Sequence, residues 1–208
     1  MKKSDLARII REEVTKVLNE STSGKTIMCV DIQPEYQKGI YFDIFEWIEY
    51  ISSVAETNNV ILLYNGPEVG GMDTNEYAYW LIEQGMDEDV LNSIIIVEKD
   101  YGFFRDAMDS GYDEEDIVSI IEYLITHDMS GADALTDEQW SEIKLHDPEI
   151  IDFIKQDNRI SIPSVLEDLD VYDNILLMGG GQDQCLREIE LLLQALGKQY
   201  TLNNKFVY

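Results

Sequence analysis

The sequence predicts an α/β fold of three layers, in which helices cover both faces of a doubly wound, mostly parallel sheet. Short apolar runs of strand length alternate with longer segments whose apolar residues recur at helical spacing. The first run, residues 26–31, is almost continuously apolar, as in a central strand that is buried on both faces. With 208 residues and a hydrophobic content of 45%, the chain is long enough for one domain with a sizeable core.

The expected strands are short apolar runs bounded by polar or glycine-rich turns. They lie at 26–31, 60–64, 94–97, 175–178 and 199–202, and residues 205–208 are a candidate edge strand. The expected helices carry apolar residues at three- and four-residue spacing, at 42–55, 74–84, 163–169 and 185–196. This alternation is typical of parallel strands joined by crossover helices.

An acidic segment at about 106–158 interrupts the alternation. Within it, residues 113–127, 137–145 and 148–155 have helical patterns that are dense in Asp and Glu. We therefore expect a helical insertion laid over the sheet. It acts either as a lid or as a solvated acidic cap with no direct role, and the sequence favours neither interpretation.

Residues 1–24 precede the α/β domain, which is expected to span 25–208. Apolar residues at helical spacing predict an amphipathic helix at 4–20, and the small residues 21–24 form a linker. The default expectation is that this helix docks on its own domain; it could also pair with a second copy in a homo-oligomer, or hold a protein partner. It also resembles short helical leaders of tailed-phage proteins, which implies a phage protein associated with the virion.

The formal net charge of −27 is the most unusual feature of the composition. A surface this acidic repels phosphate backbones and anionic lipids, so neither nucleic acid nor a membrane is an expected partner. No apolar run approaches the roughly 20 residues of a membrane span, and the N-terminus lacks the apolar centre of a signal peptide. Cys29 and Cys185 are the only cysteines. We expect no disulfide framework and a cytoplasmic location with reduced thiols.

The segment 175–196 contains the strongest candidate for chemistry. An apolar run meets three glycines, 179–181, and Cys185 follows where a helical pattern begins. The first turn of a helix has unpaired N–H groups and the positive end of the helix dipole. A cysteine there should have a lowered pKa, and nearby amides could hold an oxyanion. Taken alone, this stretch favours the simpler interpretation, in which Cys185 is a small buried residue in an ordinary strand-to-helix turn.

Two further strands end in residues that could join this cysteine. Asp31 ends the first strand and Lys99 follows the third. Because the carboxyl ends of parallel strands share one edge of a sheet, the carboxylate, the ammonium and the thiol of Cys185 could meet there. Such a trio supports nucleophilic chemistry, in which Lys99 favours the thiolate and Asp31 accepts and returns the proton. Singly, Asp31 could cap a loop and Lys99 could pair with a surface carboxylate.

The residues around these three positions resemble the isochorismatase-like cysteine hydrolase superfamily. Residues 30–33, with the letters VDIQ, are similar to the Val-Asp-hydrophobic-Gln signature of its first strand. Residues 99–104 are similar to its Lys-x-x-x-x-Phe element, and residues 179–186 are similar to Gly-x-x-x-Asp-x-Cys-Val. The resemblance covers most of 26–204 outside the insertion.

This resemblance implies an amide or acyl hydrolase of a small-molecule substrate, with no cofactor. It implies Cys185 as the nucleophile, Asp31 as the base and acid, and Lys99 as the activator. The implied oxyanion hole consists of the amides of Gly181 and Cys185, and the candidate pocket residues are Gln33, Tyr101 and Phe103. The chain departs from the family in two features. One is its long insertion. The other is the segment 180–182, which stands where the family has a turn of small residues that contains a non-proline cis peptide. Because His127 and His146 both lie in the insertion, no metal site of the nicotinamidase type is expected.

Two other classes of function remain open. One is a catalytically inactive module of the same fold, an acidic assembly or virion component held by its N-terminal helix. The other is a metal-dependent nuclease that uses Asp31, Glu98 or Asp100, and Asp183 around Mg²⁺. The net charge opposes binding of a polyanion, which disfavours the nuclease.

Overall fold

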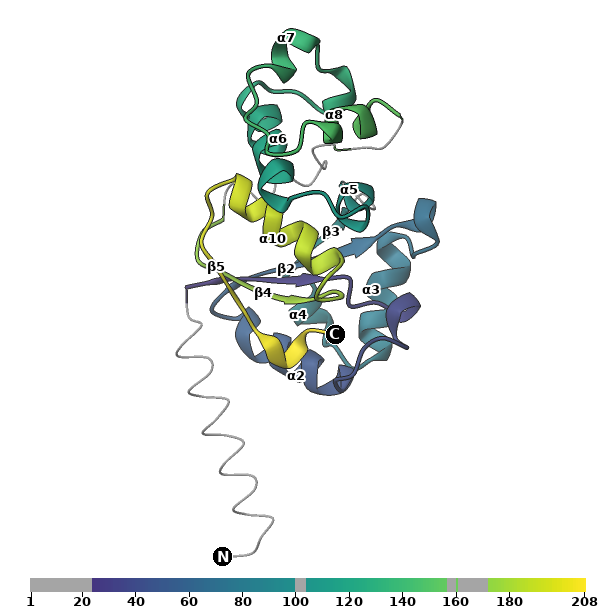
Figure 1. The fold of residues 1–208 in the computed structure, drawn as a ribbon. Helices are drawn as coiled ribbons and strands as arrows, with labels where there is room; N and C mark the ends of the chain where they lie inside the picture. The colour runs from purple at the N-terminus through teal and green to yellow at the C-terminus, as the bar shows by residue number, and fades with distance from the viewer. Residues whose placement is uncertain (1–23, 100–103, 157–159, 161–171) are drawn as a thin grey trace, which may run out of the picture.

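The computed structural model of the chain describes residues 24–99, 104–156, 160 and 172–208. The helices expected at 4–20 and at 163–169 lie outside these ranges. The described chain folds as an α/β protein around one sheet of five parallel strands in the order β3-β2-β1-β4-β5 (Figure 1). The strands are β1 Thr26–Val30, β2 Asn59–Asn65, β3 Ile95–Lys99, β4 Ile175–Gly179 and β5 Tyr200–Leu202. The predicted α/β class is confirmed, and the strand order is that of a Rossmann-like sheet.

Helices lie on both faces of the sheet (Figure 1). One face carries α2 Ile44–Ala55, α3 Thr74–Glu83 and α4 Glu88–Leu91, and the other carries α10 Cys185–Ala195. The insertion contributes α5 Arg105–Asp109, α6 Glu114–Thr126, α7 Asp137–Trp140 and α8 Glu149–Ile154. Short 3₁₀ turns occur at Pro34–Tyr36, Pro67–Val69, Ala132–Ala134 and Asn204–Phe206. The short helices α4 and α5 were not predicted, because four or five residues are too few to show a helical period.

The alternation of side chains along each strand divides the core into two layers. On β1, Ile27 and Cys29 pack with α2 and α3, whereas Met28 and Val30 pack toward α10. All four side chains are at most 1% exposed. This explains why β1 is apolar from Ile27 to Val30, as expected for a central strand with both faces covered.

The prediction of an edge strand at 205–208 is wrong. The chain forms the 3₁₀ turn Asn204–Phe206 there, and the side chain of Asn203 accepts a hydrogen bond from the N–H of Lys205 at 3.3 Å. An Asn side chain that bonds to the backbone two residues later competes with extended structure. The turn buries Phe206 against the layer of α2.

The helices after β1 and β4 pack on opposite faces of the sheet. The chain leaves β1 toward α2 on one face, and it leaves β4 toward α10 on the other (Figure 1). Because β1 and β4 are neighbours, their carboxyl ends border the topological switch point of the sheet. Ligands of open α/β sheets bind in the crevice at this point. Asp31 follows β1 and Cys185 follows β4, so the fold places both residues there.

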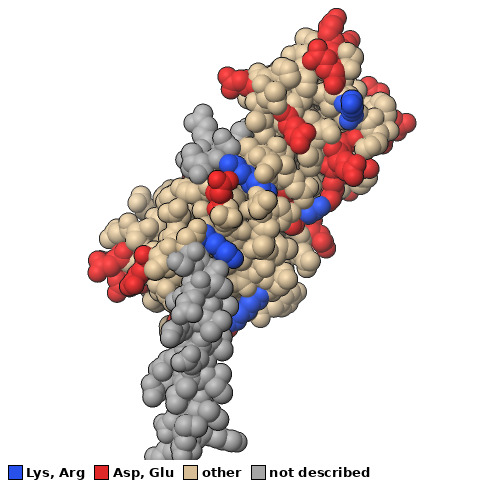
Figure 2. Space-filling model, turned by 90° about the vertical axis from the view of Figure 1, so that its left-hand side faces the viewer, with Lys and Arg blue, Asp and Glu red and all other residues tan. Residues whose placement is uncertain are grey.

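The helices α6, α7 and α8 form a lobe that packs on α10 (Figure 1). The insertion therefore contacts the outer side of α10, so that α10 lies between the lobe and the sheet. The buried carboxylate of Asp116 ties the lobe together, because it accepts hydrogen bonds from the N–H groups of His146 at 2.7 Å and of Asp147 at 2.8 Å. Figure 2 shows Asp and Glu side chains gathered on the lobe and at the opposite end of the molecule, with several Lys and Arg side chains between them.

Candidate functional site

The structure brings Asp31 and Lys99 into direct contact. Lys99 is the last residue of β3, and its Nζ lies 3.0 Å from Oδ2 of Asp31. The two side chains are 1% and 0% exposed. An ion pair removed from water in this way is strong evidence of a defined geometry, since either charge would be costly to bury alone.

Asp31 has an unusual backbone conformation. Its φ is +52°, in the left-handed region that Asp and Asn tolerate better than other non-glycine residues. Its N–H donates to the carbonyl of Leu63 at 2.8 Å, and its carbonyl accepts from the hydroxyl of Tyr208 at 2.8 Å. Carboxylate atom Oδ1 is buried, and no described residue donates a hydrogen bond to it. The main chain is therefore held from both sides while one carboxylate oxygen remains available.

Gln33 holds the segments around Asp31 and the end of β2 together through side-chain hydrogen bonds. Its Oε1 accepts from the N–H of Asn65 at 2.8 Å, and its Nε2 donates to Glu35 at 3.0 Å. Asn65 pairs in register with Lys99, and its side chain donates to the hydroxyl of Tyr36 at 2.7 Å. Gln33 is 1% exposed. The geometry thus gives Gln33 a role in holding the end of β2 next to Lys99.

The turn before Cys185 depends on glycine. Gly179 has φ +84°, and a Cβ there would lie 2.2 Å from the carbonyl oxygen of Val30. The N–H of Gly180 instead donates to that oxygen at 2.6 Å. Tyr208 closes the other side of the turn, because its N–H donates to Gly180 at 3.2 Å and its carbonyl accepts from Gln182 at 2.8 Å.

This turn leaves two amides without acceptors. The carbonyl of Gly181 accepts from the N–H groups of Gln184 and Leu186, at 2.9 and 3.3 Å. The N–H groups of Gly181 and Cys185 donate to no partner among the described residues. They are the amides that the resemblance assigns to an oxyanion hole, and Cys185 is the first residue of the eleven-residue helix α10.

The pKa of Cys185 differs from the expectation. The sequence predicts a lowered value, but burial and the negative charge of Asp31 raise the pKa of this thiol to about 12. Lys99 and Arg105 act in the opposite direction, with less effect. The residue is 8% exposed, so loss of water outweighs the helix terminus and the nearby cations. Cys185 is therefore a neutral thiol beside a carboxylate at pH 7.

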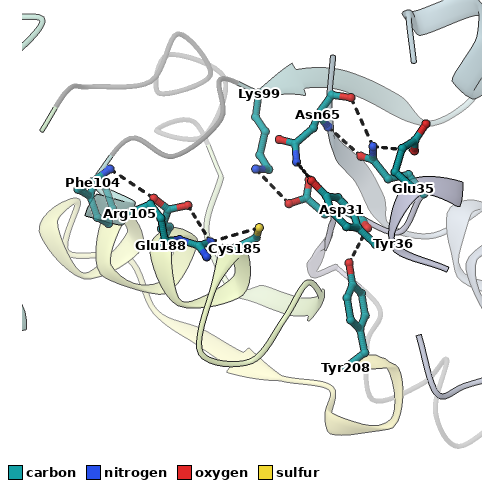
Figure 3. A network of polar contacts seen from close by, with 11 residues as sticks. Asp31, Glu35, Tyr36, Asn65, Lys99, Phe104, Arg105, Cys185, Glu188 and Tyr208 are labelled. Carbon is teal, nitrogen blue, oxygen red and sulfur yellow. Dashed lines mark hydrogen bonds and ion pairs between the residues drawn. The ribbon is translucent and has the colours of Figure 1, made fainter. Parts of the chain in front are cut away.

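A second ion pair, which the sequence analysis missed, lies on the other side of Cys185 (Figure 3). Nη2 of Arg105 is 3.3 Å from Sγ of Cys185 and 3.4 Å from Oε2 of Glu188. The N–H of Phe104 donates to Oε1 of Glu188 at 3.3 Å. Glu188 could have been found, because it lies three residues after Cys185 on the apolar face of a helix, where a carboxylate needs a partner. No comparable signal marks Arg105.

Of the remaining predicted residues, the structure describes Asp183 and Glu98, and it places neither in this cluster. Tyr101, Phe103 and Asp100 lie outside the described residues, and Asp183 is exposed in the turn before α10. Glu98 accepts a 3.3 Å hydrogen bond from the hydroxyl of Tyr64. Within the described ranges, no three His, Cys, Asp or Glu side chains gather in a way that could hold a metal ion.

Three hollows lie elsewhere on the described surface. One of about 540 Å³ lies between Lys25 and Lys198, one of about 690 Å³ lies beside Tyr79 on α3, and one of about 200 Å³ lies between Asp183 and Tyr112. None of the three is lined by Asp31, Lys99 or Cys185.

Both cysteines are free thiols, as the sequence predicts. In the part of the chain that the structure describes, every helix is too short or too polar to cross a bilayer. Comparisons of the chain with protein-family models, with curated proteins and with solved structures gave no match. The chemistry of the residues around Cys185 is therefore the basis for assigning a function.

Proposed function

We propose that this chain is a cysteine-dependent hydrolase that cleaves a small amide or a related carbonyl compound. Cys185 is the nucleophile, Asp31 accepts and returns its proton, and Lys99 balances the charge of Asp31. One observation carries the proposal. The buried ion pair between Lys99 and Asp31, 3.0 Å long, lies at the switch point of the sheet beside a cysteine that begins a helix.

Simple packing does not account for this arrangement. Two charges at the end of the sheet cost desolvation free energy, and apolar residues of the same volume would often give an equal or more stable core. Ionisable groups with perturbed environments concentrate at functional sites. The similarity of 30–33, 99–104 and 179–186 to motifs of the isochorismatase-like cysteine hydrolases supports the same assignment.

The raised pKa of Cys185 determines the order of proton transfers. Since the thiol is neutral at rest, its proton moves to Asp31 as the sulfur attacks the carbonyl carbon. The amides of Gly181 and Cys185 stabilise the resulting oxyanion. Asp31 then gives the proton to the leaving nitrogen, and a thioester remains on the sulfur. A water molecule loses a proton to Asp31 as it attacks the thioester, and that proton returns to the sulfur as the acid leaves.

The positive charge of Lys99 has a defined part in this cycle. It balances the negative charge of Asp31 in a place without solvent, so that the carboxylate is in position before the substrate binds. When Asp31 takes up the proton, the positive charge of Lys99 stabilises the negative charge that forms on the substrate oxygen.

A test that needs no knowledge of the substrate uses 4-nitrophenyl acetate as the acyl donor. We expect release of 4-nitrophenolate and an acetyl group on the peptide that contains Cys185, detected by mass spectrometry after acid quenching. Cys185→Ala and Asp31→Asn should abolish the acylation, whereas Cys29→Ala should keep it. Circular dichroism establishes that each variant is folded.

The alternative is the non-catalytic assembly module. The low exposure of Cys185 and the raised pKa of its thiol favour this alternative. In that case Cys185→Ala releases 4-nitrophenolate as fast as the unsubstituted protein, and Cys185 carries no acetyl group. Such a result would overturn the hydrolase assignment.

A further inference from the structure

We propose that Arg105 is the anion-binding residue of this site, and that the substrate carries a carboxylate close to the carbonyl that Cys185 attacks. This inference rests on the proposed function, because it takes Cys185 as the nucleophile. The position of the guanidinium is the first observation. Its Nη2 lies 3.3 Å from Sγ of Cys185, and Arg105 is 8% exposed.

Glu188 holds the guanidinium in this position. Its Oε2 lies 3.4 Å from Nη2 of Arg105, and its Oε1 accepts from the N–H of Phe104 at 3.3 Å. The carboxylate is thus fixed at both oxygens, one to the main chain and one to the cation. An arginine held in this way is already oriented for a ligand, so little conformational entropy is lost on binding.

The hydrogen-bonding capacity of Arg105 is not used up. A guanidinium has five N–H donors in a rigid fork that matches a carboxylate. Both contacts of Arg105 within the described protein are made by Nη2, at 3.3 and 3.4 Å, and both are long. The Nε donor is buried, and it finds no acceptor among the described residues. A buried unpaired donor beside a nucleophile indicates a ligand that supplies the acceptor.

On the opposite side of the site, buried hydrogen-bond acceptors lack donors within the described chain. Oδ1 of Asp31 and Oδ1 of Asn65 are buried acceptors to which no described residue donates. A ligand that has a carboxylate at one end and an amide N–H at the other satisfies both sides. Because Nη2 and Sγ are 3.3 Å apart, the carboxylate must lie within about two bonds of the attacked carbon. The monoamide of a short dicarboxylic acid has this form.

Electrostatics favours the same ligand. The charge of Lys99 is balanced by Asp31, whereas the partner of Arg105 is a carboxyl whose pKa is raised by burial. Burial thus disfavours the charged form of Glu188, while Arg105 places its positive charge beside the thiol. The chain as a whole, at −27, repels anions, so any preference for an anion must come from the site.

The test compares two alkylating reagents of nearly equal size, iodoacetate and iodoacetamide, on the intact protein. Rates of modification of Cys185 are followed by mass spectrometry of its peptide, with both reagents at the same pH. The ratio of the two rates does not depend on the fraction of thiolate, because that fraction is common to both. We expect the ratio to favour iodoacetate, and to fall by about tenfold or more in Arg105→Gln, as loss of a charge-assisted bidentate contact implies.

Arg187→Gln is the matched control. Arg187 lies on α10, the helix that Cys185 begins, and it pairs with Glu114 and Glu190. Both substitutions change the net charge by the same amount, so any effect of the overall field appears in both. The ratio should stay high in Arg187→Gln. If Arg105→Gln does not fold because Glu188 is left unpaired, the double variant Arg105→Gln with Glu188→Gln removes both charges and should lose the preference.

The outcomes separate this inference from the proposed function. An unchanged ratio in the Arg105 variants, or an equal fall in both rates, overturns anion binding by Arg105 and leaves Cys185 as the nucleophile. If neither reagent modifies Cys185 in the folded protein, the nucleophile proposal fails and this inference fails with it.

Discussion

Lys99 and Asp31 form an ion pair across an intervening strand. Lys99 ends β3 and Asp31 follows β1, yet Nζ and Oδ2 are 3.0 Å apart although β2 lies between the two strands. The lysine side chain is long enough to pass over the end of β2, where Asn65 is its register partner. The pair therefore links three strands at the edge that borders the proposed catalytic site.

Removal of Lys99 should destabilise the fold strongly. We expect Lys99→Met to lower the free energy of unfolding by about 3–5 kcal/mol, because Asp31 would remain as an unpaired buried charge. Adding Asp31→Asn should recover much of this loss, since Asn is neutral and tolerates positive φ. Urea unfolding followed by circular dichroism measures both values. The control is Lys155→Met, which breaks an exposed pair with Asp137 and should change the free energy of unfolding far less. Equal losses in the two lysine variants would contradict this prediction.

Gly179 and Gly181 should respond differently to alanine. At Gly179, with φ +84°, a Cβ would lie 2.2 Å from the carbonyl oxygen of Val30, so the ends of β1 and β4 must separate. The positive φ alone costs an alanine about 1–2 kcal/mol, and the backbone clash adds to it. At Gly181 the nearest atom, Cβ of Gln184, is 3.3 Å away. We expect thermal unfolding to show a large loss of stability for Gly179→Ala and a small change for Gly181→Ala. The reverse order would refute the assigned turn geometry.

Asp116 should control the stability of the lobe. Its carboxylate accepts the N–H groups of both His146 and Asp147, and it is fully buried. In Asp116→Asn the amide has one acceptor oxygen, and its NH₂ would face a donor, so about 1–3 kcal/mol should be lost. Hydrogen exchange with mass spectrometry should localise faster exchange to α6 and α8. The exposed Glu122 on the same helix serves as a control, because Glu122→Gln should leave exchange unchanged.

The stability of the protein should fall in alkaline solution, partly through Cys29. Burial raises the pKa of this thiol to about 12, against about 8.5 for an unfolded thiol. Below about pH 8.5 the thiol is neutral in both states, so its contribution is fully present. Above that pH the unfolded chain loses its proton first, and the contribution is lost as the pH rises toward 12.

The slope of the free energy of unfolding against pH measures the contribution of Cys29 directly. Between about pH 9 and 10, Cys29 should reduce the free energy of unfolding by about 1.4 kcal/mol per pH unit. Urea unfolding at several pH values should therefore give a shallower slope for Cys29→Ala than for the unsubstituted protein. The comparison of slopes does not depend on any loss of packing at Cys29. Parallel slopes would show that this thiol ionises equally in the folded and unfolded chain.

Much of the fold is predictable because its signals are local. The apolar run at 26–31 differs from the observed β1 by one residue, and the helices expected at 42–55 and 74–84 differ from α2 and α3 by one or two. The candidates Asp31 and Lys99 were predictable for the same reason, since each stands where an apolar run ends. The edge strand at 205–208 failed because the side chain of Asn203 favours a turn.

Part of the site was not predictable, because it depends on contacts between distant segments. Arg105 lies 80 residues from Cys185, and no apolar pattern marks it as a partner of the thiol. The sequence also predicted the wrong direction for the pKa shift of Cys185. A helix terminus and a nearby lysine are visible in the chain, whereas the loss of water around the sulfur is not.

The sequence by itself determined the α/β class, the approximate positions of the strands, and the placement of Asp31, Lys99 and Cys185 at strand ends. These features follow from hydrophobic periodicity and from glycines, which act over a few residues. Only the tertiary structure decided the strand order, the opposite directions of the chain after β1 and β4, and the pairing of Lys99 with Asp31 and of Arg105 with Glu188. Burial and charge at Cys185 arise from segments far apart in the chain, so they exist only when the whole core has assembled.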